Sequence, residues 1–165
     1  MVSRLLILTT LEFLTSGCTS PVAAIPEGTT VVYEGLPHTA YEGDLFESEK
    51  NKPTAVLHGL YFYREYHTLS GKEAETLRTA LSDASGFSPW SGEKKCGGFH
   101  ADYAVAWKED GKTFEVLICF GCGEVKRYGT GKEIREDMKK ETSDEFNELL
   151  KAYDKLRPAH QGWGP

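Results

Sequence analysis

Three cysteines and one histidine form two short motifs in the second half of the chain. Cys96 and His100 are separated by three residues, and Cys119 and Cys122 by two. Thiolate sulfur and imidazole nitrogen are ligands of zinc in tetrahedral protein sites, where Cys-x2-Cys pairs are common. The four residues therefore predict a transition-metal site for zinc, in which Asp102 would accept a hydrogen bond from the imidazole.

The same thiols are compatible with two other chemistries. A disulfide from Cys96 to Cys119 or Cys122, or between the last two, would be a purely structural cross-link, as is usual in exported proteins. Alternatively, Cys119 and Cys122 would be an exchangeable redox pair with Cys96 as the resolving thiol. In thioredoxin-like proteins a helix N-terminus activates such a pair, but Gly123 and an expected strand follow Cys122 here. The sequence leaves these alternatives open.

A β-hairpin is the clearest local prediction, and it positions these side chains. Asp110-Gly111 lies between two alternating runs, which is typical of a two-residue hairpin loop. Centring the loop there gives a hairpin over residues 102–119. One of its faces is then entirely apolar, which supports this register and marks the core side. That face carries Tyr103, Val105, Trp107, Phe114, Val116 and Ile118.

The same register brings the chemical residues together at the open end of the hairpin. Cys119 falls opposite Asp102, and His100 falls opposite Gly121. Strand alternation puts His100 and Cys119 on one face, away from the aromatic side, and diagonal neighbours across a ladder are about 7 Å apart. Cys122 follows after a spacer that glycine allows to fold back, so we expect one cluster.

Two amphipathic helices are predicted on either side of this hairpin. Residues 71–84 follow a Ser70-x-x-Glu73 capping box and present one apolar face. A final helix, capped by Thr142 or Ser143, ends at Pro158. Its apolar stripe consists of Phe146, Leu149, Leu150 and Tyr153.

The remaining segments divide into strands and loops. Residues 30–33, 54–67 and 124–128 are rich in β-branched and aromatic residues and predict strands, the second with a bulge at Gly59. Residues 39–53 and 85–98 predict loops. The order of elements gives an α+β fold, with an antiparallel sheet packed against two helices.

The first residues predict export. Arg4 precedes a short apolar run, and Thr15-Ser-Gly-Cys18 resembles a bacterial lipobox, although Thr15 stands where a bulky aliphatic residue is usual. We therefore expect lipidation of Cys18 and a membrane partner through that anchor, on the periplasmic side of the outer membrane or the cell surface. The expected organisation is a signal peptide over 1–17, a tether over 18–29, one α+β domain over 30–158 and a tail over 159–165.

Composition excludes some functions. The 165 residues carry a formal net charge of −6 and no block of Lys or Arg, which argues against nucleic acid as a partner. The chain also lacks a nucleophile elbow, a phosphate-binding loop and a His-Glu-x-x-His motif. We expect a non-enzymatic protein of the cell envelope.

Three motifs resemble those of a set of small exported bacterial lipoproteins to which no activity is attached. They cover residues 33–38 (YEGLPH), 95–103 (KCGGFHADY) and 118–124 (ICFGCGE). The resemblance implies a location in the cell envelope and gives no preference between metal and disulfide. Its first motif ends at His38, a possible additional member of the site.

Overall fold

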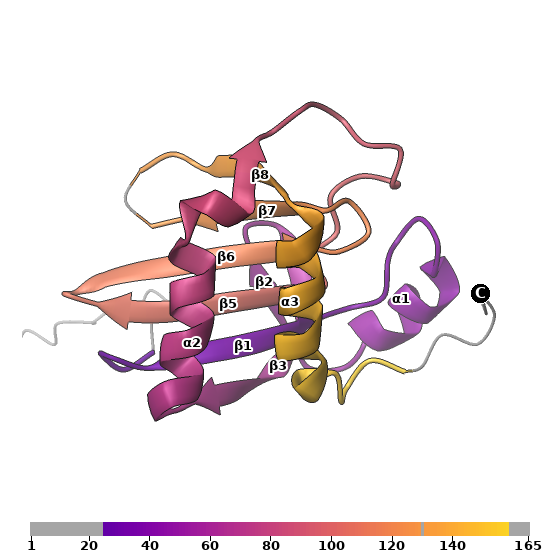
Figure 1. The fold of residues 1–165 in the computed structure, drawn as a ribbon. Coiled ribbons are helices and arrows are strands. Elements are labelled where there is room, and N and C mark those ends of the chain that lie inside the picture. Colours follow the sequence, from indigo (N-terminus) through magenta and orange to yellow (C-terminus); the bar gives the residue numbers. More distant parts are fainter. Residues whose placement is uncertain (1–24, 130, 159–165) are drawn as a thin grey trace, which may run out of the picture.

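The computed structural model describes residues 25–129 and 131–158, and it is an α+β fold, as predicted (Figure 1). Eight strands form one antiparallel sheet in the order β2-β3-β1-β5-β6-β7-β8-β4. The strands are β1 (Thr30–Gly35), β2 (Thr54–Leu57), β3 (Leu60–Leu69), β4 (Phe87–Pro89), β5 (Tyr103–Glu109), β6 (Lys112–Cys119), β7 (Glu124–Tyr128) and β8 (Ile134–Met138). The helices are α1 (Gly43–Lys50), α2 (Gly71–Ser82) and α3 (Lys140–Leu150), with short 3-10 turns at Ala84–Gly86 and Lys151–Tyr153.

The β5–β6 hairpin has the register that the Asp110-Gly111 loop predicts. Glu109 pairs with Lys112, and Tyr103 pairs with Ile118. Asp110 and Gly111 have φ values of 52° and 71°, the left-handed pair that a type I′ turn requires. The six predicted core residues all lie in or against the main hydrophobic cluster, where α2 and α3 cover the sheet.

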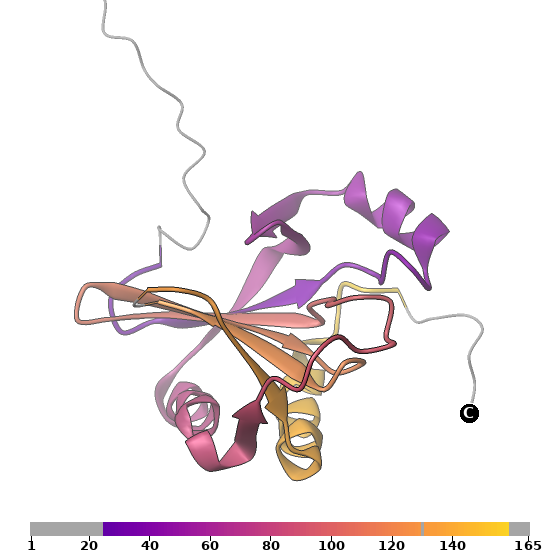
Figure 2. The same ribbon diagram turned by 90° about the horizontal axis from the view of Figure 1, so that it is seen from above.

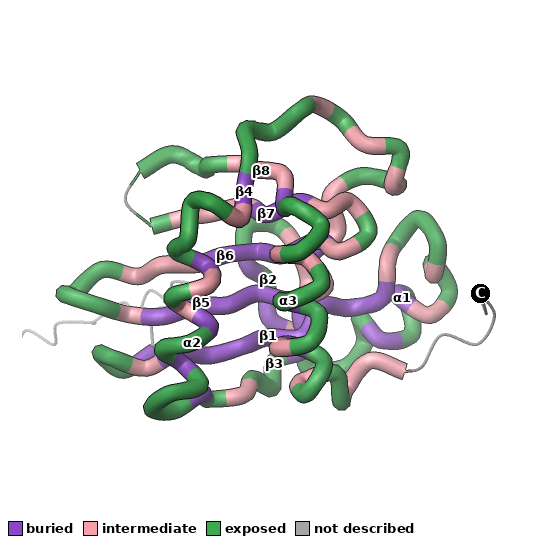
Figure 3. Tube along the Cα trace, viewed as in Figure 1, coloured by how far each residue is buried: buried purple, intermediate pink, exposed green. Residues whose placement is uncertain are grey.

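The opposite face of the sheet is also covered, which the alternating pattern did not predict. Leu117 and Ala104 are fully buried there, in a second cluster with Leu57 and Phe62 from the β2–β3 hairpin. Seen from above, α2 and α3 lie on one side of the central strands, and α1 and the β2–β3 turn, where the sheet curls over, lie on the other (Figure 2). Strand β1 is consequently buried along its whole length, as are the first five residues of β5 and the last four of β6 (Figure 3).

Both predicted helices are present, with different ends. Ser70 is the N-cap of α2 but makes no side-chain capping bond, so the expected capping box does not form. Helix α3 begins at Lys140 rather than at Thr142 or Ser143, and its N-cap Lys139 also lacks such a bond. Their apolar faces, including Leu77, Leu81, Phe146 and Leu150, are buried as predicted.

Two predictions about the N-terminal half were wrong. Residues 54–67 are two paired strands instead of one, because His58 and Gly59 adopt positive φ values of 50° and 81° and reverse the chain. Residues 39–53 contain helix α1 where a loop was expected. This helix is held by tertiary contacts: Phe46 is buried in a cluster that includes Leu36 and Tyr63.

The expected signal peptide (1–17), Cys18, most of the tether and the tail (159–165) lie outside the described residues. Ile25, at the end of the expected tether, is only 5% exposed and packs in the second cluster. Gly28 donates a backbone hydrogen bond to Lys108. The packed part of the chain thus extends to residue 25. Over the described ranges, no helix combines the length and the apolar character needed to cross a membrane.

Candidate functional site

The three sequence motifs meet at one end of the sheet. After β1 ends at Gly35, the chain continues to His38. The loop from Trp90 to Asp102 passes beside this segment. Cys119 ends β6, and Cys122 lies in the turn that leads to β7. Close approach of backbones makes this possible. A Cβ on Gly35 would lie 2.0 Å from the carbonyl oxygen of Ala101, so only glycine fits there.

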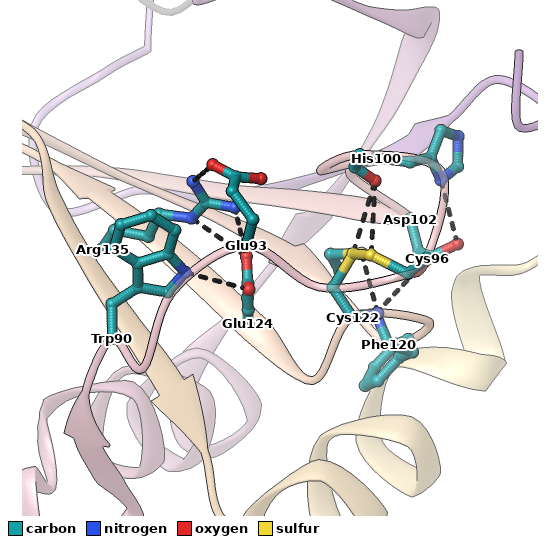
Figure 4. Close-up of a disulfide and its surroundings, with 11 residues drawn as sticks. Trp90, Glu93, Cys96, His100, Asp102, Phe120, Cys122, Glu124 and Arg135 are labelled. Carbon is teal, nitrogen blue, oxygen red and sulfur yellow. Dashed lines mark hydrogen bonds and ion pairs between the residues drawn. A yellow bond between two sulfur atoms is a disulfide. The ribbon is translucent and has the colours of Figure 1, made fainter. Parts of the chain in front are cut away.

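Cys96 and Cys122 form a disulfide (Figure 4). It connects the glycine-rich loop to the β6–β7 turn, with Cα atoms 5.6 Å apart and 26 positions between the two residues in sequence. The carbonyl oxygen of Gly98 lies 3.6 Å and 3.4 Å from the two sulfur atoms. Both cysteines are partly exposed, so the bond is accessible from solvent.

Cys119 is a free thiol beneath this disulfide and is only 2% exposed. Its sulfur accepts the backbone N–H of Cys122 at 3.2 Å. Burial raises the pKa of Cys119 to about 11, although the backbone N–H groups of His100 and Cys122 act in the opposite direction. In the oxidised protein Cys119 is therefore a protonated, poorly nucleophilic thiol.

Both ring nitrogens of His100 face acceptors. Nε2 lies 2.6 Å from the backbone oxygen of Leu36, so this nitrogen carries a proton and donates. Nδ1 lies 3.5 Å from Oδ1 of Asp102. In a neutral ring, the lone pair of Nδ1 would face the negatively charged Oδ1 of Asp102, and the two would repel each other. A cation between these two atoms would remove that repulsion.

Asp102 and Arg157 form an ionic network beside the histidine. Oδ2 of Asp102 accepts the backbone N–H of Phe120 at 2.8 Å, and Oδ1 lies 3.2 Å from Arg157, which also pairs with Glu42. Burial would raise the pKa of Asp102, but His100, the Phe120 N–H and Arg157 outweigh it and hold this pKa below its usual value.

The His38 ring contacts the rings of His100 and Tyr41, with centroids 4.7 Å from each and interplanar angles of 37° and 44°. Its Nδ1 accepts the N–H of Ala40 at 3.0 Å, which puts the proton of the neutral ring on Nε2. Nε2 is buried and makes no hydrogen bond within the described structure. Burial and the neighbouring His100 lower the pKa of His38.

These residues line a cavity of about 620 Å³. Its wall includes His38, Tyr41, Cys96, His100 and Arg157, with Asp102 and Cys119 also contributing. A cavity of about 690 Å³ lies between α2 and the β5–β6 hairpin, but it is lined by no cysteine or histidine. Of these two cavities, the first contains the residues in which the sequence indicated chemistry.

The structure thus brings Cys96, His100, Asp102, Cys119 and His38 to one cavity, and the fifth predicted residue, Cys122, is bonded to Cys96. Within the described ranges, no group of three or more His, Cys, Asp or Glu side chains is arranged to hold a metal ion. Two of the predicted ligands, Cys96 and Cys122, are bonded to each other. Zinc binding therefore stays a prediction. Sequence reasoning missed Glu42 and Arg157, because their pairing joins segments more than a hundred positions apart.

A second polar cluster lies along the same loop (Figure 4). Glu124 is fully buried, accepts the indole N–H of Trp90 at 3.1 Å and binds Arg135 through two hydrogen bonds of 3.0 and 2.8 Å. The guanidinium of Arg135 stacks on the Trp90 ring at 4.1 Å. This cluster holds the start of the loop that carries Cys96.

Comparison with known proteins identifies no relative. No protein-family model matches the chain, and no curated protein or solved structure is similar to it. The resemblance of the three motifs to exported lipoproteins accordingly stays a prediction, and the function is argued from the site alone.

Proposed function

We propose that this protein is a non-enzymatic, lipid-anchored binding module of the bacterial cell envelope, whose cavity at the end of the sheet receives a small ligand. One observation carries the proposal. The Cys96–Cys122 disulfide fixes a glycine-rich loop beside a cavity of about 620 Å³, a volume typical of ligand sites, into which several polar side chains converge. A disulfide also suits an oxidising, exported location.

The state of the polar groups supports binding over catalysis. Cys119 is buried and protonated, both nitrogens of His100 face acceptors, and Asp102 is held by a backbone N–H and Arg157. Among the described residues, the buried Nε2–H of His38 makes no hydrogen bond, although the Cys96 backbone lies near the ring, and such a donor favours a ligand with an oxygen acceptor. Tyr41, 59% exposed beside it, adds an aromatic surface.

The location is tested by expressing the full chain in a bacterium and measuring the intact mass of the membrane-extracted protein. We expect a chain that begins at Cys18 and carries added lipid mass. Cys18→Ala should leave the protein unprocessed. A wild-type chain that keeps residues 1–17, or one that is processed without lipid, would contradict the anchor.

The ligand is tested by comparing native and denatured masses of the same protein. Gly121 lines the cavity, has open space around its Cα and no positive φ, so Gly121→Leu should fill the cavity. Ser82→Leu, at the other cavity, is the matched control. We expect extra mass lost on denaturation in the wild type and in Ser82→Leu, and none in Gly121→Leu. Equal native and denatured masses in the wild type would contradict the proposal.

A further inference from the structure

Three cysteines meet at this end of the sheet. Two of their sulfur atoms are bonded in the Cys96–Cys122 disulfide, and the third, of Cys119, lies 3.2 Å from the backbone nitrogen of Cys122. The turn that creates this contact is tight: Gly123 has a φ of 63° and donates its N–H to Phe120 at 3.2 Å. Backbone N–H groups directed at a sulfur atom stabilise a thiolate. The oxidised protein therefore holds all three cysteines at one end of the sheet, with two of the sulfur atoms bonded to each other.

The fourth ligand is determined by the hydrogen bonds of the two histidines. A metal-binding imidazole usually donates its other N–H to a carbonyl or carboxylate. His100 does this, because its Nε2 donates to the Leu36 carbonyl and Nδ1, which faces Asp102, keeps its lone pair for a cation. Its backbone N–H also approaches the Cys119 sulfur. His38 has the opposite tautomer, since Nδ1 accepts the Ala40 N–H and Nε2 carries the proton.

We propose that reduction of the Cys96–Cys122 disulfide converts this cluster into a zinc site, with Cys96, Cys119 and Cys122 as thiolate ligands and Nδ1 of His100 as the fourth. A dithiol reductant supplies two electrons and two protons, and its own thiols become a disulfide. Zinc then displaces the three thiol protons into solvent. Three thiolates and one imidazole are a standard tetrahedral set for this ion.

The local charges favour the cation. Asp102 faces Nδ1 of His100 at 3.5 Å, where a cation relieves the opposition of two acceptors. The zinc site belongs to the reduced protein, and it is independent of whether the oxidised cavity binds a ligand.

The test is zinc titration of the full chain carrying Cys18→Ser, which removes the only other thiol, before and after treatment with a phosphine reductant. Native mass spectrometry should show one zinc per chain after reduction and none before it. With Co²⁺ in place of zinc, reduction should produce the intense visible absorption of a tetrahedral thiolate site. Absence of metal from the reduced protein, or equal binding by the oxidised protein, would overturn the proposal.

Matched variants identify the ligands. His100→Ala should weaken zinc binding by the reduced protein at least tenfold, on the order seen when metal-site residues are removed. His38→Ala should leave the affinity within about twofold. Cys119→Ala should abolish the cobalt absorption. If that variant does not fold, judged by circular dichroism, Cys96→Ser on the partly exposed loop gives the same readout. Unchanged affinity in His100→Ala would contradict this ligand set.

Discussion

The carboxylate of Glu34, on β1, accepts the backbone N–H of Arg157 at 2.8 Å across 123 positions of sequence. It also accepts the N–H groups of Leu156 at 2.8 Å and Lys155 at 3.2 Å. The backbone N–H groups of three consecutive residues after the last helical turn thus all donate to the Glu34 carboxylate, and Glu34 is only 2% exposed. This contact places the guanidinium of Arg157 beside Asp102, and so the end of the chain becomes part of the site.

Glu34→Gln should lower the free energy of unfolding by about 1–3 kcal/mol, because the amide keeps one acceptor but turns an NH₂ group toward backbone donors. Urea denaturation measures the loss. Glu65→Gln, an exposed residue on β3, is the control and should change stability by less than about 0.5 kcal/mol. Equal stabilities of the two variants would show that the Glu34 contact contributes little.

Gly35→Ala should be among the most damaging small substitutions. The added methyl would lie 2.0 Å from the Ala101 carbonyl oxygen, and neither backbone segment can yield without breaking sheet pairing. We expect a loss of about 3 kcal/mol or more in thermal or urea unfolding. Gly121→Ala, which has open space around it, should behave like the wild type. A Gly35→Ala protein of wild-type stability would contradict the close approach.

Glu124→Gln should loosen the loop that begins at Trp90. The substitution leaves the Arg135 guanidinium without its buried carboxylate and should cost about 3 kcal/mol, the lower end for buried ion pairs because Arg135 keeps some exposure. Trp90 fluorescence should shift to longer wavelength as the loosened loop exposes the indole to water. Glu93→Gln is the control, since Glu93 is 76% exposed in its pair with Arg135 and should contribute almost nothing.

His38 should make stability depend on pH below neutrality. Burial and His100 lower its pKa in the folded protein, against weaker opposing effects of Asp102, Glu42 and the Cys96 backbone. The unfolded chain therefore binds a proton that the folded chain does not. Stability is fully present above the unfolded value of 6.5 and is lost as the pH falls from there toward the folded pKa. We expect the free energy of unfolding, measured with urea between pH 7.5 and 5.5, to depend less steeply on pH in His38→Gln than in the wild type. The same pH dependence in both proteins would refute the assignment to His38.

The local pattern of the sequence was sufficient for the elements whose signals are local. Asp110-Gly111 fixed the hairpin register, because a two-residue loop with positive φ leaves one way to pair the flanking strands. The 3.6-residue stripes gave α2 and α3, and β7 was predicted with its observed bounds. The proximity of His100, Asp102 and Cys119 also followed from that register.

Tertiary structure decided the features that depend on distant partners. Helix α1 forms because Phe46 packs on Leu36 and Tyr63, and β8, a charged segment, is a strand because β7 pairs with it. The sequence offered three ways to join the thiols, and only the path of the loop brings Cys96 to Cys122 while Cys119 stays buried. Motif spacing is a property of neighbouring residues, whereas the bonding partner of a cysteine depends on which distant backbones the fold holds together.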